Sequence, residues 1–398
     1  MEASLQIGTK LRAAREARGL SGETIAEAVG ISRQLYNMYE TEERQIPLTT
    51  LQRVAASLGR SVDELTASTL DVPVFSRPSF HFRTDSQEWD KHSRAQLLWL
   101  DSALRFYVEL LAETDVKPCA ALRSPFEAST KRAGRVEAER SARRVRDHLN
   151  LGLGTLPAVF DLTDRDVMTF RLPLGTDLST APSGLFFKDQ SAGHCIVINA
   201  DQTVGRQHFT FAHELAHAYF HSHRTGGIVS MNGSPEAKER FANDFAREFL
   251  MPADLVHAIV ESRPDWSRDP IQAGVVLELQ RIFQVSFIAM AVQLRRLSLI
   301  KPAQLAALGA TSPNRLAAQL GLPSSTLDRP PAPLHRFEQI PSCYRWLVIC
   351  AVEQGKVSLG EVAENLVVST EDVRRLLDTA PDADGQELAF NLADLSLA

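Results

Sequence analysis

The sequence predicts a mainly α-helical protein with a small β-sheet, an α+β fold divided into several domains. Three observations lead to this prediction. Apolar residues recur at helical spacing through much of the chain, short apolar runs bounded by Gly, Pro and Asp lie between residues 151 and 200, and two stretches rich in Pro and Ser interrupt the helical patterns. With 398 residues, 44% hydrophobic and 23% charged, the chain is long enough for two to four globular domains.

Composition narrows the range of partners. The net charge of −6 carries no overall nucleic-acid signature, so any DNA contact must come from a local surface. The N-terminus lacks a basic and then apolar signal pattern, and no apolar run approaches the about 18 residues of a membrane span. We therefore expect a cytoplasmic protein with no membrane partner. The four cysteines lack CxxC spacing, which favours reduced thiols over a cysteine zinc site.

Changes in composition divide the chain into five parts. The linker stretches Thr66–Ser79 and Leu322–Leu334 are rich in Pro, Ser and Thr and separate helical patterns. We expect an N-terminal helical domain, a linker with a long helix, an α+β domain, a second linker and a C-terminal helical unit, at residues 1–68, 69–129, 130–300, 301–333 and 334–398.

The first part contains a helix-turn-helix pattern between Leu20 and Glu40. Ser21 and Ser32 can each cap a helix, and Gly30 suits a tight turn with positive φ. Two short helices with apolar inner positions around such a turn form a helix-turn-helix. The alternative is an ordinary helical hairpin, but the helical pattern continues to the end of this part.

That continuation, KLRAAREARGLSGETIAEAVGISRQLYNMYE and then IPLTTLQRVAASLGRSVDEL, resembles the Xre family of phage-repressor-like DNA-binding domains through five helices. The resemblance implies that the helix after Ser32 lies in the major groove of double-stranded DNA. It implies that four side chains face the bases: Arg33, Gln34, Asn37 and Met38. Tyr36 and Tyr39 would pack inward.

Two departures from the Xre pattern affect the expected strength of binding. Gly22 stands where the family usually has a phosphate-contacting Gln, and the turn after Glu40 is longer and more acidic than usual. Residues 1–68 hold eight Lys and Arg against nine acidic residues. We therefore expect modest, salt-dependent affinity, and a homodimer on an operator with an inverted repeat.

The middle of the chain predicts helices followed by a small sheet. An amphipathic helix is expected over residues 88–114, and the basic segment 131–149 has helical spacing that favours a solvated face over a nucleic-acid patch. The runs VMTFRL, GLFFK and CIVINA predict β-strands. The last run ends just before a helical segment, so the sheet should pack beside that helix. Residues 280–300 predict one turn leading into one long helix.

The helical segment after the strands carries a metal-binding pattern. Residues 207–224 contain helix formers and no Gly or Pro. His213 and His217 share one helix face, and Glu214 lies about 100° around the helix, where it can hydrogen-bond a metal-bound water. This is the HExxH arrangement, in which two His bind zinc and Glu is the general base. The alternative is a chance match, with two surface histidines flanking a solvated Glu.

Zinc catalysis needs a third ligand and an open position. Candidates in the sequence are His221, His223, Glu236, Glu239 and Glu248. His221 is eight residues beyond His213, about 12 Å along a helix, so both cannot bind one ion. A His217–His221 pair would leave Glu214 without a role. We expect His221 and His223 to be ordinary polar residues near the cleft or hydrogen-bond donors on the substrate side.

The segment EAKERFANDFAREFLMP provides the preferred third ligand. Glu239 and Asn243 fall on one helical face, so a helix that crosses the HExxH helix could bring Glu239 to the metal. Asn243 could then orient His213 or His217. On spacing alone, solvated surface acids remain the default reading of Glu236 and Glu239.

Three blocks, QHFTFAHELAHAYFH, ERFANDFAREFLMP and FQVSFIAMAVQLRRL, resemble the ImmA/IrrE family of metallopeptidase-like proteins across residues 130–300. His208 stands where many relatives have Arg, and Ala216 where Gly is common, but neither change removes a ligand. The resemblance implies a zincin-like metallopeptidase domain with Glu214 as catalytic base. It implies three zinc ligands: His213, His217 and Glu239.

The final unit again predicts helix, short turn and helix, within residues 355–377. It can be a second helix-turn-helix or a plain packing unit. Few basic residues accompany it, which favours protein–protein contact or dimerisation.

Two functions fit these features. The first is a DNA-binding transcriptional regulator whose zinc-metallopeptidase domain cleaves a repressor, or this chain itself, in response to a signal. The second is a non-catalytic regulator or antitoxin-like protein that represses its operon and binds a partner protein such as a toxin, with the zinc fold as sensor or scaffold. The complete HExxH motif with a third Glu favours the first, and the joined DNA-binding module favours DNA-centred regulation under both.

Overall fold

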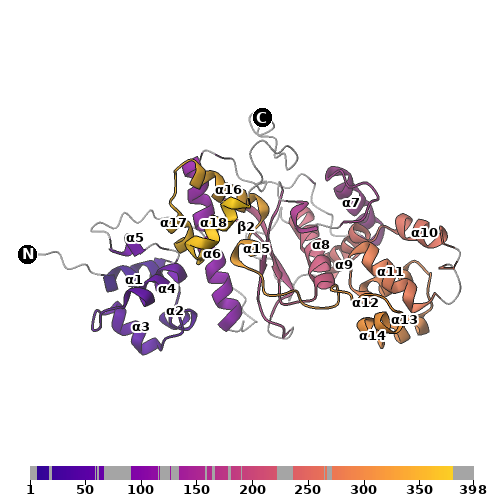
Figure 1. The fold of residues 1–398 in the computed structure, drawn as a ribbon, viewed down its shortest axis with the longest axis horizontal. Helices are drawn as coiled ribbons and strands as arrows, with labels where there is room; N and C mark the ends of the chain where they lie inside the picture. Colours follow the sequence, from indigo (N-terminus) through magenta and orange to yellow (C-terminus); the bar gives the residue numbers. More distant parts are fainter. Residues whose placement is uncertain are drawn as a thin grey trace, which may run out of the picture. The chain divides into compact units, whose positions relative to one another are not determined.

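The structure, a computed structural model, describes residues 7–17, 20–58, 60, 62–66, 91–114, 116, 126, 134–156, 159–163, 166–177, 181–189, 191–221, 236–263, 265–266 and 271–379. These residues are mostly helical and include one three-stranded sheet, so the predicted fold class is confirmed (Figure 1). The chain divides into two compact units. The first comprises Met1–Cys119, Gln190–Ala192 and Ser342–Ala398, and the second Ala120–Asp189 and Gly193–Pro341.

The first unit begins with five short helices around an apolar core: α1 (Ile7–Ala17), α2 (Gly22–Ala28), α3 (Arg33–Glu40), α4 (Leu48–Leu58) and α5 (Val62–Thr66). The expected turn signals are present. The Ser21 and Ser32 hydroxyls accept hydrogen bonds from the backbone N–H groups of Thr24 and Leu35. Gly30, with φ of 67°, makes the turn between α2 and α3, a conformation that favours glycine.

The rest of the first unit comes from the middle and the end of the sequence. Helix α6 (Lys91–Thr114) contacts α2 and α4 on the one hand and α16 (Ser342–Glu353) and α17 (Leu359–Leu366) on the other. The Trp99 indole N–H donates to the Leu366 carbonyl at 3.0 Å, and the Tyr344 hydroxyl donates to the Ala103 carbonyl at 2.5 Å. The C-terminal helices, with α18 (Thr370–Asp378), therefore share a packing unit with the N-terminal domain and α6.

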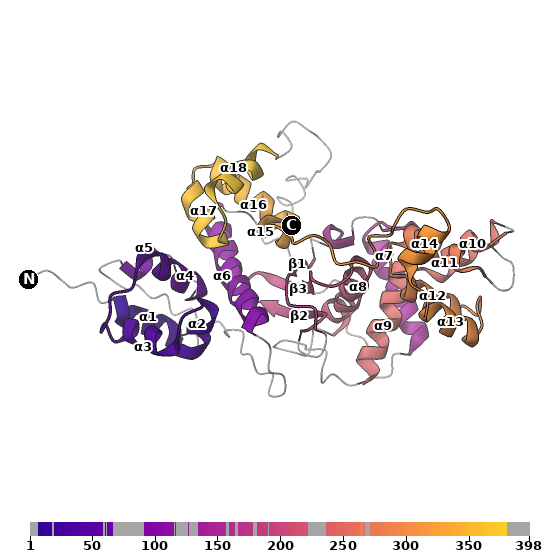
Figure 2. The same ribbon diagram turned by 60° about the horizontal axis from the view of Figure 1, so that its bottom comes forward.

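The second unit contains the sheet, with β1 (Met168–Leu172), β2 (Gly184–Asp189) and β3 (Gly193–Asn199) at the three predicted positions. The central strand β3 is parallel to β1 and antiparallel to β2, with Phe170 opposite Val197 and Phe186 opposite Ile196. All seven residues of β3 are buried. Helix α8 (Val204–Phe220) packs on β2 and β3, as Figure 2 shows.

Further helices complete this unit: α7 (Arg135–His148), the 3₁₀ turn η1 (Val159–Asp161), α9 (Glu236–Leu250), α10 (Ala253–Glu261), α11 (Ala273–Phe283), α12 (Phe287–Arg296), α13 (Pro302–Gly309), α14 (Pro313–Gln319) and α15 (Arg336–Gln339). Helices α7 and α8 both pack against α9. Among the described residues no single helix is long and apolar enough to cross a membrane. Helices α11 and α12 together have the length and composition of a membrane span, but they are bent by 104° relative to each other.

The turn and the helix expected within residues 280–300 are present, because Gln284 adopts a left-handed conformation after α11 and Ser286 caps helix α12, which ends at Arg296. Another segment differs from what the sequence suggested. Residues 301–333, expected as a linker, contain α13 and α14. Pro302 and Pro313 stand at the first positions of these helices, where proline is tolerated, and Leu308 and Ala317 are buried in the core.

The basic helix α7 is only partly solvated. Arg135 and Arg140 form exposed pairs with Glu139 and Glu137 on the same helix, as a solvated face would. Arg146, however, is 1% exposed, and its guanidinium donates to three carbonyls, those of Phe249, Gly152 and Gly154. The interpretation of this helix as a solvated face is therefore wrong for Arg146, because tertiary packing encloses it and satisfies its donors.

Candidate metal centre

Helix α8 is the centre of the second unit. It packs against both the sheet and α9, so most of its residues are buried, polar ones included. The exposed fractions are 2% for His213, 0% for Glu214 and 1% for His217. Buried polar side chains cost free energy unless they find partners. The chemical role of these three residues therefore depends on the groups that contact them.

The structure brings His213, His217 and Glu239 together. One potential ligand atom from each residue lies within 4.8 Å of the others. The Nε2 atoms of His213 and His217 are 3.2 Å apart, and the Glu239 carboxylate approaches them at 3.2 and 3.5 Å. Three atoms converging in this way can bind a single ion.

Helix α9 delivers Glu239 because its aromatic face packs on α8. Phe241 and Phe245 lie four residues apart and contact Phe220 of α8, with ring centroids 5.6 and 5.7 Å away. Glu239 and Asn243 occupy another face of the same helix. The Glu239 side chain is 21% exposed, so the cluster is reached from solvent on this side.

The other candidate ligands have different places. The Glu248 side chain pairs with Arg143 at 3.2 Å and accepts from the Ala253 N–H, so it serves packing away from the cluster. Glu236 begins α9, and His223 lies outside the described residues.

Glu214 is a buried carboxyl without protein partners. Neither of its oxygens has a hydrogen-bond partner among the described residues. Burial raises the pKa of Glu214 to about 7, with the charge of Glu239 acting in the same direction and that of His213 opposing it. Gly184, at the start of β2, lies against it. A Cβ atom at Gly184 would come within 3.3 Å of the Glu214 Cγ and would collide with Thr210.

His221 was expected to be an ordinary polar residue near the cleft, and it instead contacts the cluster. Its Nδ1 lies 2.9 Å from Nδ1 of His217, and its ring packs against Phe241. Burial, followed by the charges of Lys238 and His213, lowers the pKa of His221 to about 4. A neutral His221 can accept the Nδ1–H of His217, which leaves the His217 Nε2 lone pair free for a metal.

The pKa values of His217 and His213 are shifted in opposite directions. Burial lowers the pKa of His217 well below its usual value, assisted by the charges of His213 and His221. Burial also disfavours the charged form of His213, but the hydrogen bond with Glu239, the nearby carboxylate charges and a hydrogen bond with Asn243 together raise the pKa of His213. The raised pKa favours the charged form of His213 beside the Glu239 carboxylate, a place that a bound cation could take instead.

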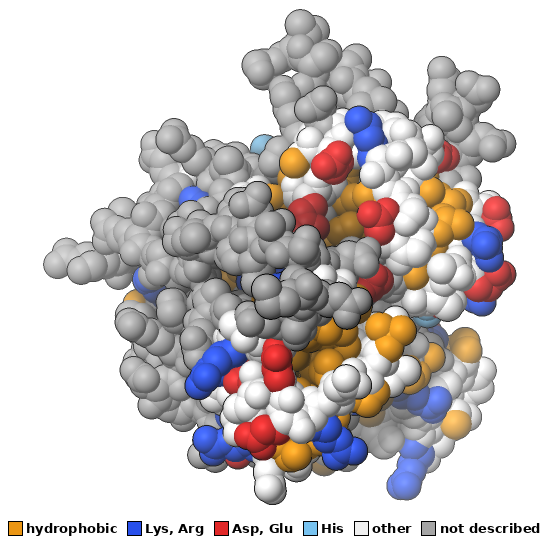
Figure 3. Space-filling view, turned by 90° about the vertical axis from the view of Figure 1, so that its left-hand side faces the viewer, with side chains coloured by type: hydrophobic (Ala, Val, Ile, Leu, Met, Phe, Trp, Pro, Cys, Tyr) orange, Lys and Arg blue, Asp and Glu red, His pale blue; other side chains and the backbone are white. Residues whose placement is uncertain are grey.

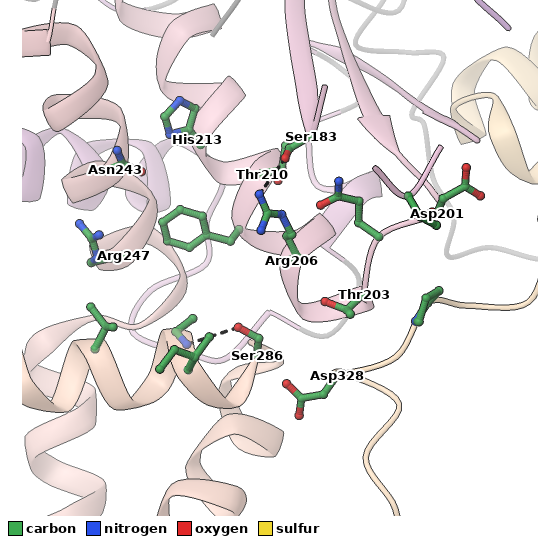
Figure 4. A pocket seen from close by; sticks show the side chains of 17 residues that line it. Ser183, Asp201, Thr203, Arg206, Thr210, His213, Asn243, Arg247, Ser286 and Asp328 are labelled. Carbon is green, nitrogen blue, oxygen red and sulfur yellow. Dashed lines mark hydrogen bonds between the residues drawn. The ribbon is translucent and has the colours of Figure 1, made fainter. Parts of the chain in front are cut away.

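These residues fit a divalent metal by their chemistry. Two imidazoles and one carboxylate form one of the ligand sets of catalytic zinc sites, which leave one position for water or substrate. The buried oxygens of Glu214 and one oxygen of Glu239 lack hydrogen-bond partners among the described residues, and an ion with its water would satisfy them. A cavity of about 720 Å³ opens beside His213 and Asn243 (Figure 4).

The predicted DNA-facing residues lie on the surface of the first unit. Arg33, Gln34 and Asn37 of α3 are exposed and Met38 is half-buried. Tyr36 and Tyr39 are buried as expected, at 1% and 5% exposure. Lys and Arg side chains alternate with Asp and Glu on the face drawn in Figure 3. Residues 1–68 hold nearly balanced charge, with eight Lys and Arg against nine acidic residues.

Comparison with known protein families gives a match for each of two regions, the N-terminal helices and the part of the second unit that contains the cluster. A search of curated proteins found no match to the chain. Residues 11–65 match the helix-turn-helix family, which supports binding to double-stranded DNA. Residues 163–295 match the peptidase family described as IrrE N-terminal-like domain, whose members are typically metal-dependent. This match covers both α8 and α9 and therefore the whole His–His–Glu cluster. The chain thus joins a helix-turn-helix DNA-binding domain to an IrrE-type peptidase-like domain.

Proposed function

We propose that this chain is a transcriptional regulator that hydrolyses a peptide bond of a repressor protein, or of this chain itself, in response to a signal. Glu214 carries the proposal. It is a fully buried carboxyl without hydrogen-bond partners among the described residues, next to a cluster suited to a metal. A purely structural zinc site is closed by its ligands and has no use for such a group. A carboxyl with a pKa of about 7 suits proton transfer.

The residues take separate roles in this reaction. His213, His217 and Glu239 would hold the zinc, and Asn243 orients His213 through a hydrogen bond. Bound zinc supplies a Lewis acid for the peptide carbonyl. Glu214 takes a proton from the attacking water and passes it to the departing amine. His221 holds the ring of His217 in place.

The first unit directs this activity to a promoter. In the proposal α3 enters the major groove, with Arg33, Gln34, Asn37 and Met38 towards the bases. The protein acts in the cytoplasm as a homodimer on an inverted repeat. The near balance of charge in residues 1–68 supports modest binding that is sensitive to salt.

The test compares the zinc-loaded wild type with Glu214→Gln, which keeps the three ligands but cannot accept a proton. Each protein is incubated alone and with a pool of unfolded casein, and intact chains and fragments are identified by mass spectrometry. We expect fragments only with the wild type, and loss of those fragments on chelation.

The alternative function gives a different result. One zinc per chain, with neither protein producing fragments of itself or of casein, would contradict general peptidase activity. It would favour the non-catalytic regulator or antitoxin-like protein, which uses the zinc fold to bind a partner such as a toxin.

A further inference from the structure

The cavity beside the metal cluster lies entirely within the second unit. One end is formed by His213 and Asn243, and the opposite end by Asp201 and Asp328, as Figure 4 shows. Its volume of about 720 Å³ is in the range of ligand-binding cavities. A molecule in this cavity would therefore lie directly against a side chain of the metal cluster.

One wall of the cavity is apolar. Helix α12 contributes Ile288, Ala289 and Val292, which follow one face at helical spacing, and α8 contributes Phe209. Phe209 and Val292 are half-buried, and Ile288 is 48% exposed. The Arg247 guanidinium lies 5.8 Å from the centre of the Phe209 ring and is anchored by Asp244 at 3.1 Å. This wall has the character of a binding surface for a hydrocarbon side chain.

The charged groups at the far end already have partners in the protein. The Asp328 carboxylate accepts hydrogen bonds from the Phe287 N–H at 3.0 Å and from the Gln280 amide at 2.8 Å. Asp201 accepts from the Gly175 N–H at 2.7 Å, and Arg206 donates to the Ser183 hydroxyl at 3.0 Å. These groups shape the rim, and they do not require a charged ligand to satisfy them.

We propose that this cavity is the subsite that receives one apolar side chain, of the size of Leu or Phe, next to the peptide bond that is cleaved. The inference rests on the proposed peptidase function and adds the kind of residue that its substrate must present. Continuity with the cluster supports it, because His213 and Asn243 line the same cavity as the apolar wall. Burial of such a side chain should raise affinity by about 10- to 100-fold over glycine.

Hydroxamates test the proposal, because they bind zinc through a constant group while one side chain varies. The probes are four N-acyl amino-acid hydroxamates with Gly, Leu, Phe or Asp side chains, titrated into the zinc-loaded full chain by calorimetry. We expect the Leu and Phe probes to bind about 10- to 100-fold more tightly than the Gly probe. The Asp probe should bind no better than the Gly probe.

Two matched variants locate the effect. Ile288→Asp places a charge on the apolar wall, and Val136→Asp places the same charge at another exposed aliphatic residue, 68% exposed on α7. The preference for Leu and Phe should disappear in Ile288→Asp and persist in Val136→Asp. Both positions are solvent-accessible, so both variants should fold.

The remaining outcomes separate the inference from the function on which it rests. Equal affinities for all four probes, with one zinc bound, would overturn the apolar subsite and leave the metal centre intact. Tightest binding of the Asp probe would also overturn it, and would assign the cavity to an acidic side chain near Arg206 or Arg247. A chain that binds neither zinc nor any probe would overturn the proposed function together with the inference.

Discussion

The His–His–Glu cluster and helix α3, which is predicted to face DNA, place polar side chains in opposite environments. His213, Glu214 and His217 are at most 2% exposed, whereas Arg33 and Asn37 are open to solvent. The cluster depends on three elements, since α9 supplies Glu239 and β2 approaches Glu214 through Gly184. Helix α3 carries all its predicted contacts itself.

Because of this difference, folding stability and function should depend on different residues around α3 but on the same residues in the buried cluster. A polar group in water can be replaced at little cost in folding free energy, whereas a buried one leaves its partners unsatisfied. Substitutions in the cluster should therefore change both the fold of the second unit and its chemistry. Substitutions on α3 should change DNA binding alone.

Removal of a ligand should have the largest effect. His217→Ala or Glu239→Ala should lower zinc affinity by at least about 100-fold, because a large binding free energy is shared among only three side chains. Competition with a zinc chelator measures the affinity, and metal analysis gives the stoichiometry. His257→Ala, on the surface of α10, is the control and should keep one zinc. A variant without Glu239 that still binds one zinc tightly would contradict its role as third ligand.

The contact between β2 and α8 should give the next largest effect. Gly184→Ala should destabilise the protein by about 1–3 kcal/mol, because the added Cβ collides with Thr210 and crowds Glu214. Chemical denaturation measures the change. Thr210→Ser removes the colliding methyl group and should restore part of the lost stability. If Gly184→Ala alone is as stable as the wild type, the close approach at Glu214 is refuted.

Substitutions on α3 should lower the affinity for DNA without lowering the stability of the fold. Arg33→Ala and Asn37→Ala should each weaken binding to a DNA site selected by the wild type by about 10-fold or more, in line with about 1–3 kcal/mol for a base contact. Fluorescence anisotropy measures binding, and thermal unfolding should be unchanged. Arg140→Ala, an exposed substitution on α7, is the control. Loss of stability in either α3 variant would contradict the separation of fold from function in this region.

A pH effect should be the smallest and should be confined to the second unit. Burial lowers the pKa of His208 below its usual value of 6.5, with the Arg171 charge assisting and a hydrogen bond to the Gln284 carbonyl opposing. The unfolded chain then binds the proton more readily, so this contribution to stability is present above pH 6.5 and is lost as the pH falls below it. Hydrogen exchange of α8 peptides between pH 7 and 5.5, corrected for intrinsic rates, should show this loss.

His208→Gln retains a donor for the Gln284 carbonyl and should reduce the pH dependence. Residues 1–68 contain no histidine, so protection in the N-terminal domain should not follow the same trend. An equal pH dependence in both regions, or an unchanged one in His208→Gln, would assign the effect to other groups.

Short-range features could be predicted because the groups that make them lie within one or two turns of the chain. Ser21, Gly30 and Ser32 set the ends of α2 and α3 through their own backbone neighbours. The pairing of His213 with His217 follows from helix periodicity alone. The turn expected within residues 280–300 is local as well, since the left-handed Gln284 ends α11 and Ser286 caps α12.

The features missed in the sequence depend on neighbours that are distant along the chain. His221 has the same spacing from His217 as His217 has from His213, a signal that could have suggested its contact. Nothing near Gly184 in the sequence indicates that Glu214 lies against it. Nor does the basic run of α7 reveal that Arg146 is enclosed, since its partners include the carbonyl of Phe249.

The sequence by itself determined the mainly α fold class, the three strands, the helix-turn-helix and the histidine pair, because periodicity and capping act over a few residues. The tertiary structure decided that Glu239 meets that pair, that Glu214 is buried without a hydrogen-bond partner among the described residues, and that a cavity with one apolar wall opens beside His213. It also decided that α6 and the C-terminal helices pack with the N-terminal domain. These contacts arise from complementary surfaces on elements far apart in the chain, and no local pattern encodes them.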